Sequence, residues 1–174
     1  PTAECCPDCG GQFTHLGEDV SEMLEYVPAS FKVIREQMQA QAEAQAELAA
    51  AAGVAFLAEN AKKAGVTVLE SDLQYEVLTA GEGAKPSATD NVRTHYHGTL
   101  INGTVFDSSY ERGEPAEFPV GGVIAGWVEA LQLMNTGSKW RLTVPSELAY
   151  GGQAAGSIPP HSVLVFDVEL LAVL

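Results

Sequence analysis

The residues best suited to chemistry lie in the second half of the chain, and most of them are aromatic. One acidic side chain, Asp107, stands directly beside Phe106 in this set. Large apolar rings with few polar groups among them are typical of a dry binding pocket. The candidate pocket residues are Tyr96, Phe106, Asp107, Phe118, Trp127, Tyr150 and Phe166.

A second group with chemical potential lies at the start of the chain, where all three cysteines fall within five residues. The motif CPDC from Cys6 to Cys9 suits a metal-binding knuckle or a redox pair. A tetrahedral zinc site needs four nitrogen or sulfur ligands, and only Cys5 and His15 could complete one. Because Cys5 and Cys6 are adjacent, they are poorly placed to ligate together. We therefore expect no structural zinc here.

Two histidines, His95 and His97, alternate along one expected strand and point the same way. Such a pair could chelate a metal, but a site of this kind needs a third ligand nearby. The simpler interpretation is two exposed histidines on a sheet. We assign no metal and no cofactor to this protein.

The formal net charge of -14 excludes some partners. Residues 1–64 carry 4 basic and 10 acidic side chains, and residues 65–174 carry 5 and 13. Since neither part is basic, we expect no nucleic-acid partner. The longest apolar run, Leu48 to Ala58, has 11 residues, whereas a bilayer-spanning helix needs about 20. We expect no membrane partner either.

Composition divides the chain into three parts. Residues 1–30 form a small segment with the cysteines and mixed polarity. Residues 31–65 are rich in Gln, Ala and Glu, which favour a helix. Lys62 and Lys63 are expected in its last turn, and Gly65 is expected to end it.

Residues 66–174 alternate between short apolar strands and turns. In 126–134, Trp127, Ala130, Leu131 and Met134 follow helical spacing instead. One short helix among strands predicts an α+β domain with an antiparallel sheet. The expected strands are 67–79, 91–100, 116–120, 139–144 and 163–173.

Four motifs in this domain resemble the FKBP-type peptidyl-prolyl cis-trans isomerases: THYHGTLINGTVFDSS, VIAGWVEALQLM, VPSELAYG and IPPHSVLVFDVELL. They occur in the family's order and cover residues 66–174. The chain is most similar to the bacterial group with an N-terminal helical arm, which includes the macrophage infectivity potentiators. The resemblance implies a five- to six-stranded antiparallel sheet curled around one short helix. A long helix and a small N-terminal segment would precede it.

The resemblance also implies a reaction, the cis-trans isomerisation of X–Pro bonds without covalent intermediate or cofactor. An apolar cup suits it, because the barrier of about 18–20 kcal/mol arises from amide resonance. Trp127 would form the floor, and the Tyr150 hydroxyl and the Ile158 backbone N–H would bind substrate carbonyls. Asp107 would orient Tyr150 or the substrate. Val123, Ile124 and Ile158 would line the substrate-binding wall.

Partners are implied in the same way. They are proline-containing peptides and unfolded proteins, macrolide inhibitors of the tacrolimus and rapamycin type, and a second copy of the chain bound through the N-terminal helix. An alternative function is a chaperone-like module that grips client chains and isomerises them only incidentally. We expect a cytoplasmic protein, or a periplasmic one if a signal peptide has been removed.

Residues 6–35 instead resemble the zinc-binding segment of IS66-type transposases, truncated before its second cysteine pair. The local pattern favours a different structure, because Val20, Met23, Leu24 and Val27 follow helical spacing behind a candidate cap at Asp19. The transposase resemblance favours extended structure. The sequence leaves both alternatives open.

Overall fold

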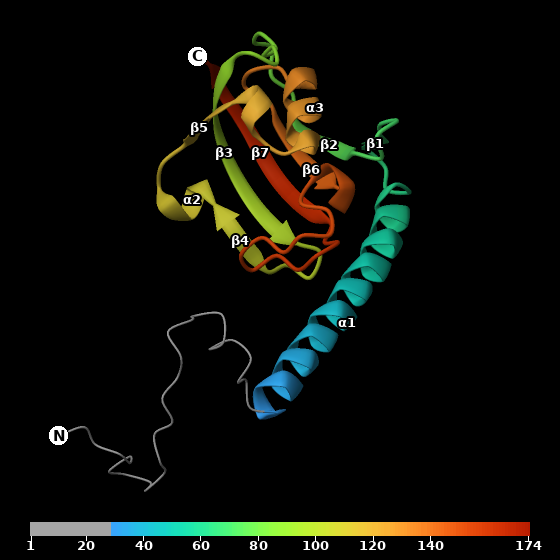
Figure 1. Cartoon of the computed structure of the whole chain (residues 1–174). Coiled ribbons are helices and arrows are strands. Elements are labelled where there is room, and N and C mark those ends of the chain that lie inside the picture. Colours follow the sequence, from blue (N-terminus) through green and yellow to red (C-terminus); the bar gives the residue numbers. More distant parts are fainter. Residues whose placement is uncertain (1–28) are drawn as a thin grey trace, which may run out of the picture. The chain divides into compact units, whose positions relative to one another are not determined.

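The computed structural model describes the backbone of residues 29–174, and side-chain environments from residue 36 onward (Figure 1). The expectations for the cysteines, His15 and residues 6–28 lie outside the described part. The chain divides into two compact units, residues 1–41 and residues 42–174. The division into 1–30, 31–65 and 66–174 stays a prediction.

The Gln/Ala/Glu-rich stretch forms helix α1, Ala29–Asn60. The long helix is confirmed, but its expected end is wrong, because Lys62 and Lys63 lie beyond it. The Asn60 side chain turns to the sheet, where it donates to Gln74 Oε1 at 2.9 Å and Thr143 Oγ1 at 3.2 Å. After Asn60 the backbone tightens, with Lys62 N–H bonded to the Glu59 carbonyl. Docking of Asn60 therefore sets where the helix stops.

The domain is an antiparallel sheet folded over one helix, which confirms the α+β class (Figure 1). The described part contains seven strands, all paired antiparallel, in the order β1-β2-β6-β7-β3-β4, with β5 also paired to β3. They are β1 Val66–Val68, β2 Gln74–Thr79, β3 Asn91–Leu100, β4 Val105–Ser108, β5 Ala116–Pro119, β6 Lys139–Val144 and β7 Leu164–Val173.

The count of seven rather than five or six has two causes. The expected strand 67–79 is a hairpin of β1 and β2, turned at Asp72, whose φ of 64° lies in the left-handed region. Asp tolerates that conformation better than most residues. Strand β4, with only four residues, has too little alternation to be recognised from sequence.

Helix α3, Ala125–Leu133, packs against the concave face of the sheet. The short helix α2, Ser109–Arg112, follows β4, and the single turns η2, Val120–Gly122, and η3, Ser146–Leu148, flank α3 and β6 in sequence. The core between α3 and the sheet buries Leu131, Met134, Leu142, Leu164 and Leu170 completely. This core fixes the helix whose first turn carries Trp127.

Candidate active site

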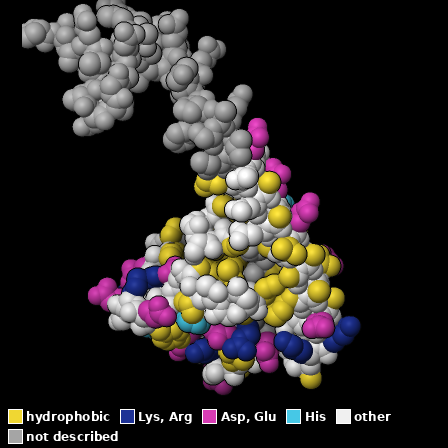
Figure 2. All heavy atoms as spheres, turned by 90° about the horizontal axis from the view of Figure 1, so that it is seen from below, with side chains coloured by type: hydrophobic (Ala, Val, Ile, Leu, Met, Phe, Trp, Pro, Cys, Tyr) yellow, Lys and Arg dark blue, Asp and Glu magenta, His cyan; other side chains and the backbone are white. Residues whose placement is uncertain are grey.

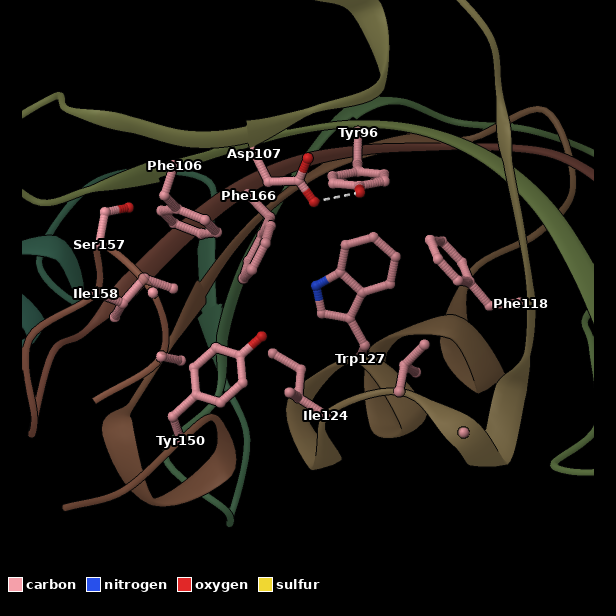
Figure 3. A pocket seen from close by; sticks show the side chains of 14 residues that line it. Tyr96, Phe106, Asp107, Phe118, Ile124, Trp127, Tyr150, Ser157, Ile158 and Phe166 are labelled. Atoms are coloured by element: carbon pink, nitrogen blue, oxygen red, sulfur yellow. Dashed lines mark hydrogen bonds between the residues drawn. The ribbon is translucent and has the colours of Figure 1, made fainter. Parts of the chain in front are cut away.

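A cavity of about 740 Å³ opens between the concave face of the sheet and the start of α3 (Figure 3). All ten residues expected to form the pocket line it: Tyr96, Phe106, Asp107, Phe118, Val123, Ile124, Trp127, Tyr150, Ile158 and Phe166. Sequence reasoning missed four further lining residues: Gly122, Ala155, Gly156 and Ser157. The volume is in the range of sites for drug-sized ligands and short peptide segments.

Strand periodicity places the wall residues. Alternate residues of β3 and β7 are buried, so Tyr96 and Phe166 both face inward. Gly98 pairs with Phe166 on one side and with Asp107 on the other. A register shift in the β3–β4 pair follows Gly98, and a bulge of this kind re-aims neighbouring side chains. Consecutive residues Phe106 and Asp107 therefore both line the cavity.

Trp127 is the floor of the cavity, and three rings meet it edge to face (Figure 3). Its ring centroid lies 5.3 Å from Tyr96, 5.3 Å from Phe166 and 5.9 Å from Phe118, at interplanar angles of 84–88°. Phe106 completes the wall by meeting Phe166 edge to face at 5.5 Å. Edge-to-face pairs contribute about 0.5–1.5 kcal/mol each beyond burial. The rings are thus held rigidly before any ligand binds.

The polar rim joins Tyr96, Asp107 and Arg112. The Tyr96 hydroxyl donates to Asp107 Oδ2 at 2.5 Å (Figure 3), and Arg112 donates to the same hydroxyl at 2.6 Å. Arg112 also forms an ion pair with Asp107 Oδ1 and places its guanidinium 5.3 Å from the centre of the Tyr96 ring. The expectation that Asp107 orients Tyr150 or the substrate stays a prediction; among the described residues the side-chain partners of Asp107 are Tyr96 and Arg112.

These contacts fix the protonation states of the rim. Burial and the hydrogen bond to Asp107 raise the pKa of Tyr96. Burial alone would raise the pKa of Asp107, but hydrogen bonds from Tyr96 and Arg112 outweigh it and lower that pKa. The hydrogen bonds that Arg112 donates to Tyr96 and to Asp107 raise the pKa of Arg112. At neutral pH the rim therefore holds a carboxylate, a guanidinium and a neutral phenol.

Sequence reasoning also missed Arg112, although a signal for it exists. Ser108 caps α2 by accepting from the backbone N–H of Glu111, and this Ser-x-x-Glu spacing is typical of a helix start. Helix α2 then turns the chain back so that Arg112, its last residue, reaches the Asp107 carboxylate at the end of β4. The cap signal in DSSYER thus predicts the ion pair.

Several donors of the cavity-lining residues have no partner in the described part of the chain, among them the buried indole Nε1–H of Trp127 at the cavity floor. The Tyr150 hydroxyl points into the cavity, and Tyr150 is 43% exposed (Figure 3). Ile124 is the N-cap of α3, and its carbonyl accepts from the backbone N–H groups of Trp127 and Val128. Its own backbone N–H has no partner in the described residues. A helix start is favourable to a carbonyl oxygen.

The Ile158 backbone N–H, expected to bind a substrate carbonyl, is not free. It donates to the Ala155 carbonyl at 3.0 Å, and Ala155 N–H returns a bond to Ile158 at 3.1 Å. The reason is a tight turn in which Gly156 has a φ of 59°. The expectation is wrong for this amide, because its hydrogen is already used within the turn.

Comparisons with known proteins agree with this geometry. Residues 82–171 match the family profile described as FKBP-type peptidyl-prolyl cis-trans isomerase, and residues 13–77 match the domain amino terminal to that isomerase. The chain belongs to the FKBP-type peptidyl-prolyl cis-trans isomerases. As such it is an isomerase, and the proteins of this family bind proline-containing peptides and unfolded clients.

Three relatives illustrate the match. The FKBP-type 22 kDa isomerase of Escherichia coli K12 is 56% identical over 159 residues, which cover 91% of this chain and 77% of the relative. The outer membrane protein MIP of Legionella longbeachae is 46% identical over 154 residues, with coverages of 87% and 66%. The crystal structure of FkpA from Escherichia coli has a TM-score of 0.81 at 42% identity and covers 89% and 73%.

The chain spans 52–77% of the length of the curated relatives it matches. Two expectations change with these comparisons. The cytoplasmic location is contradicted, since one of these FKBP relatives is an outer membrane protein. The resemblance of residues 6–35 to IS66-type transposases finds no support, because the profile matched from residue 13 belongs to the isomerases themselves.

Two findings concern metals and membranes. Among the described residues, no three His, Cys, Asp or Glu side chains lie together as a metal site would require. None of the helices in the described part combines the length and hydrophobicity to cross a bilayer. The face shown in Figure 2 carries acidic and basic side chains around scattered apolar areas.

Proposed function

We propose that the FKBP cavity is the catalytic site, with the prolyl ring lying on Trp127 between Phe106, Phe118 and Phe166. The observation that carries this proposal is the aromatic cup itself, in which Trp127 is only 4% exposed and three rings meet its edges. A five-membered apolar ring suits such a wall, because burying it against aromatic rings removes apolar surface from water.

The cup lowers the barrier through its polarity. A planar amide carries negative charge on oxygen through resonance, and the twisted amide gives that charge up. An apolar, water-excluding wall therefore disfavours the planar form relative to the twisted one, whereas water stabilises the planar form. The reaction needs no nucleophile, and each 1.4 kcal/mol of barrier is worth about tenfold in rate.

Two of the unpaired donors hold the substrate in place. The Tyr150 hydroxyl and the Ile124 backbone N–H each bind a carbonyl oxygen next to the proline, so that one side of the bond is fixed while the other rotates. Asp107 acts from the rim, where Tyr96 and Arg112 hold its carboxylate. Holding one side of the bond fixes the geometry in which the other side rotates, and this positioning reduces the entropic part of the barrier.

A protease-coupled assay with a Phe-Pro peptide tests the proposal. Phe106→Ala removes one wall and should lower kcat/KM by about tenfold or more. Arg93→Ala, which breaks an exposed ion pair with Glu117 outside the cavity, should leave kcat/KM unchanged. A wild-type rate equal to the uncatalysed rate, or full activity of Phe106→Ala, contradicts the proposal.

Macrolides of the tacrolimus and rapamycin type are proposed ligands of the same cavity. Its volume of about 740 Å³ and its aromatic walls suit a large, mostly apolar ring system. Tacrolimus should inhibit the wild-type enzyme competitively with peptide, and Phe106→Ala should weaken the inhibition. Inhibition that is not competitive would place the macrolide elsewhere.

A homodimer through the N-terminal helix is the proposed assembly. Apolar side chains on α1 are exposed, with Met38 at 66% and Leu48 at 71%. A second copy of the helix would cover them, and the Ala-rich neighbours allow close approach. Light scattering on the full chain should give a dimer mass that falls to a monomer mass in the double variant Met38→Glu, Leu48→Glu. A monomeric wild type overturns this proposal.

A further inference from the structure

Residues 108–112, which end in the rim residue Arg112, contact two histidines on the outer face of the sheet. Strand β5 pairs with β3 as far as Thr94, and β4 pairs with it from His97 onward. His95 and Tyr96 lie in the gap between the two partner strands. The buried Ser109 hydroxyl fills this gap, accepting from Tyr96 N–H at 2.8 Å and contacting the Tyr96 carbonyl at 3.2 Å.

His95, on the outer face of β3, contacts the first residues of α2. Its Nδ1 lies 2.9 Å from Ser109 Oγ, and its ring stacks on Tyr110 at 4.7 Å and 15°. The Tyr110 hydroxyl donates to Glu169 Oε2 at 2.8 Å, and Lys139 Nζ lies 5.4 Å from the Tyr110 ring. Ser109 and Tyr110 are thus both fixed to the outer face of the sheet.

His97 holds the residue directly after Asp107. Its Nδ1 lies 3.0 Å from Ser108 Oγ, the oxygen that caps α2 by accepting from Glu111 N–H. Because that oxygen accepts from the helix, its own proton is available to His97 Nδ1. Three consecutive residues, 108–110, are therefore tied to two histidines. Arg112, which binds Asp107 and Tyr96, is two residues further on.

We propose that His95 and His97 are positioning residues for isomerisation, which act through Ser109 and Ser108 to hold Asp107 and Arg112 in place at the rim. This inference rests on the proposed function of the cavity. Neither histidine lines the cavity, so neither touches the substrate. Their effect must pass through the Ser108–Arg112 turn.

The test uses the full chain and three substitutions of His97. His97→Ala should lower kcat/KM about three- to tenfold, which corresponds to one lost hydrogen bond. His97→Asn places an acceptor near the position of Nδ1 and should restore activity to within about twofold, since the same bond re-forms. His97→Gln reaches past Ser108 and should resemble His97→Ala. If His97 only filled space, His97→Gln should retain a higher kcat/KM than His97→Asn.

A double-mutant cycle separates positioning from general stability. In an Arg112→Ala background, His97→Ala should cause no further loss of kcat/KM, because both act through one network. Thr99→Ala is the matched control, since Thr99 lies on the same strand and face and reaches only the Val165 carbonyl at 3.5 Å. It should leave kcat/KM unchanged. Melting temperatures for every variant exclude unfolding as the cause.

Three outcomes are informative. Equal activity of wild type and His97→Ala, or additive losses in the cycle, overturns the positioning role. If Arg112→Ala and Asp107→Ala also leave kcat/KM unchanged, the proposed catalytic site itself fails. If those two lower kcat/KM and the histidine variants do not, only the positioning role fails.

Discussion

Gly98 is the position where one methyl group should disturb the cavity most. A Cβ atom there would lie 2.7 Å from Phe106 Cζ and 2.9 Å from Phe166 Cε1, although real Cβ contacts essentially never fall below 3.0 Å. Both rings would have to move, and overpacking of this kind costs about 1–3 kcal/mol. We expect Gly98→Ala to lower Tm by about 2–4 °C for each kcal/mol.

The same displacement should reduce activity, because both rings are walls of the cavity. We expect kcat/KM to fall about tenfold at a temperature where the variant is fully folded, since shifts well below 1 Å in a positioned site are costly. Gly103→Ala is the control. Its φ of 85° makes alanine unfavourable, yet nothing lies within 4 Å of the added atom. It should lose about 1–2 kcal/mol of stability and keep wild-type activity. Wild-type stability and activity in Gly98→Ala would refute the reasoning.

Three further predictions follow from the hydrogen bonds. Tyr150→Phe should lower kcat/KM about three- to tenfold, with unchanged Tm because the hydroxyl has no partner in the described residues; equal activity in the protease-coupled assay argues against a carbonyl-binding role. Because the pKa of Asp107 is lowered, wild type should be more stable than Asp107→Asn in urea above the ordinary Asp pKa of about 3.9, and this difference should vanish as pH falls through the lower folded pKa; a difference independent of pH contradicts it. Burial and the bond to Glu169 raise the pKa of Tyr110 to about 12. Its contribution to stability should therefore persist below the ordinary Tyr pKa of about 10 and be lost as pH rises toward the folded value. Compared with wild type, the absorbance titration of Tyr110→Phe should lose the phenol that ionises near pH 12. If the variant instead loses a phenol that ionises near the ordinary Tyr pKa of about 10, the assignment is wrong.

Where the sequence predicted structure well, a long-range pattern was present. Strands β3 and β6 begin and end where alternation predicts, at Asn91–Leu100 and Lys139–Val144. Each has one largely buried face, and burial on one face produces the alternation of apolar and polar residues. The ten pocket residues came from the family motifs, which specify neighbours in space that periodicity cannot show.

The failures lie where a local contact competes with the pattern. The β1–β2 turn at Asp72 interrupts an alternation that continues on both sides of it, so the pattern alone shows one strand. The end of α1 depends on hydrogen bonds from Asn60 to residues 14 and 83 positions away. The turn at Ala155 closes on the Ile158 amide, and no composition rule indicates that this donor is already used.

Arg112 explains how a carboxylate can stand at the edge of an apolar cavity in a chain of net charge -14. An unpaired carboxylate would keep its hydration shell, and that water would stabilise the planar amide which the cup disfavours. The guanidinium and the Tyr96 hydroxyl bind the Asp107 oxygens, so the charges of the rim offset each other, while the Arg112 and Asp107 side chains stay 49% and 41% exposed on their outer side. The buried Trp127 Nε1–H also has no partner among the described residues. The donors proposed for the substrate carbonyls are the Tyr150 hydroxyl and the Ile124 amide. Both lie across the cavity from the rim, and the rotating bond is held between the two sides (Figure 3).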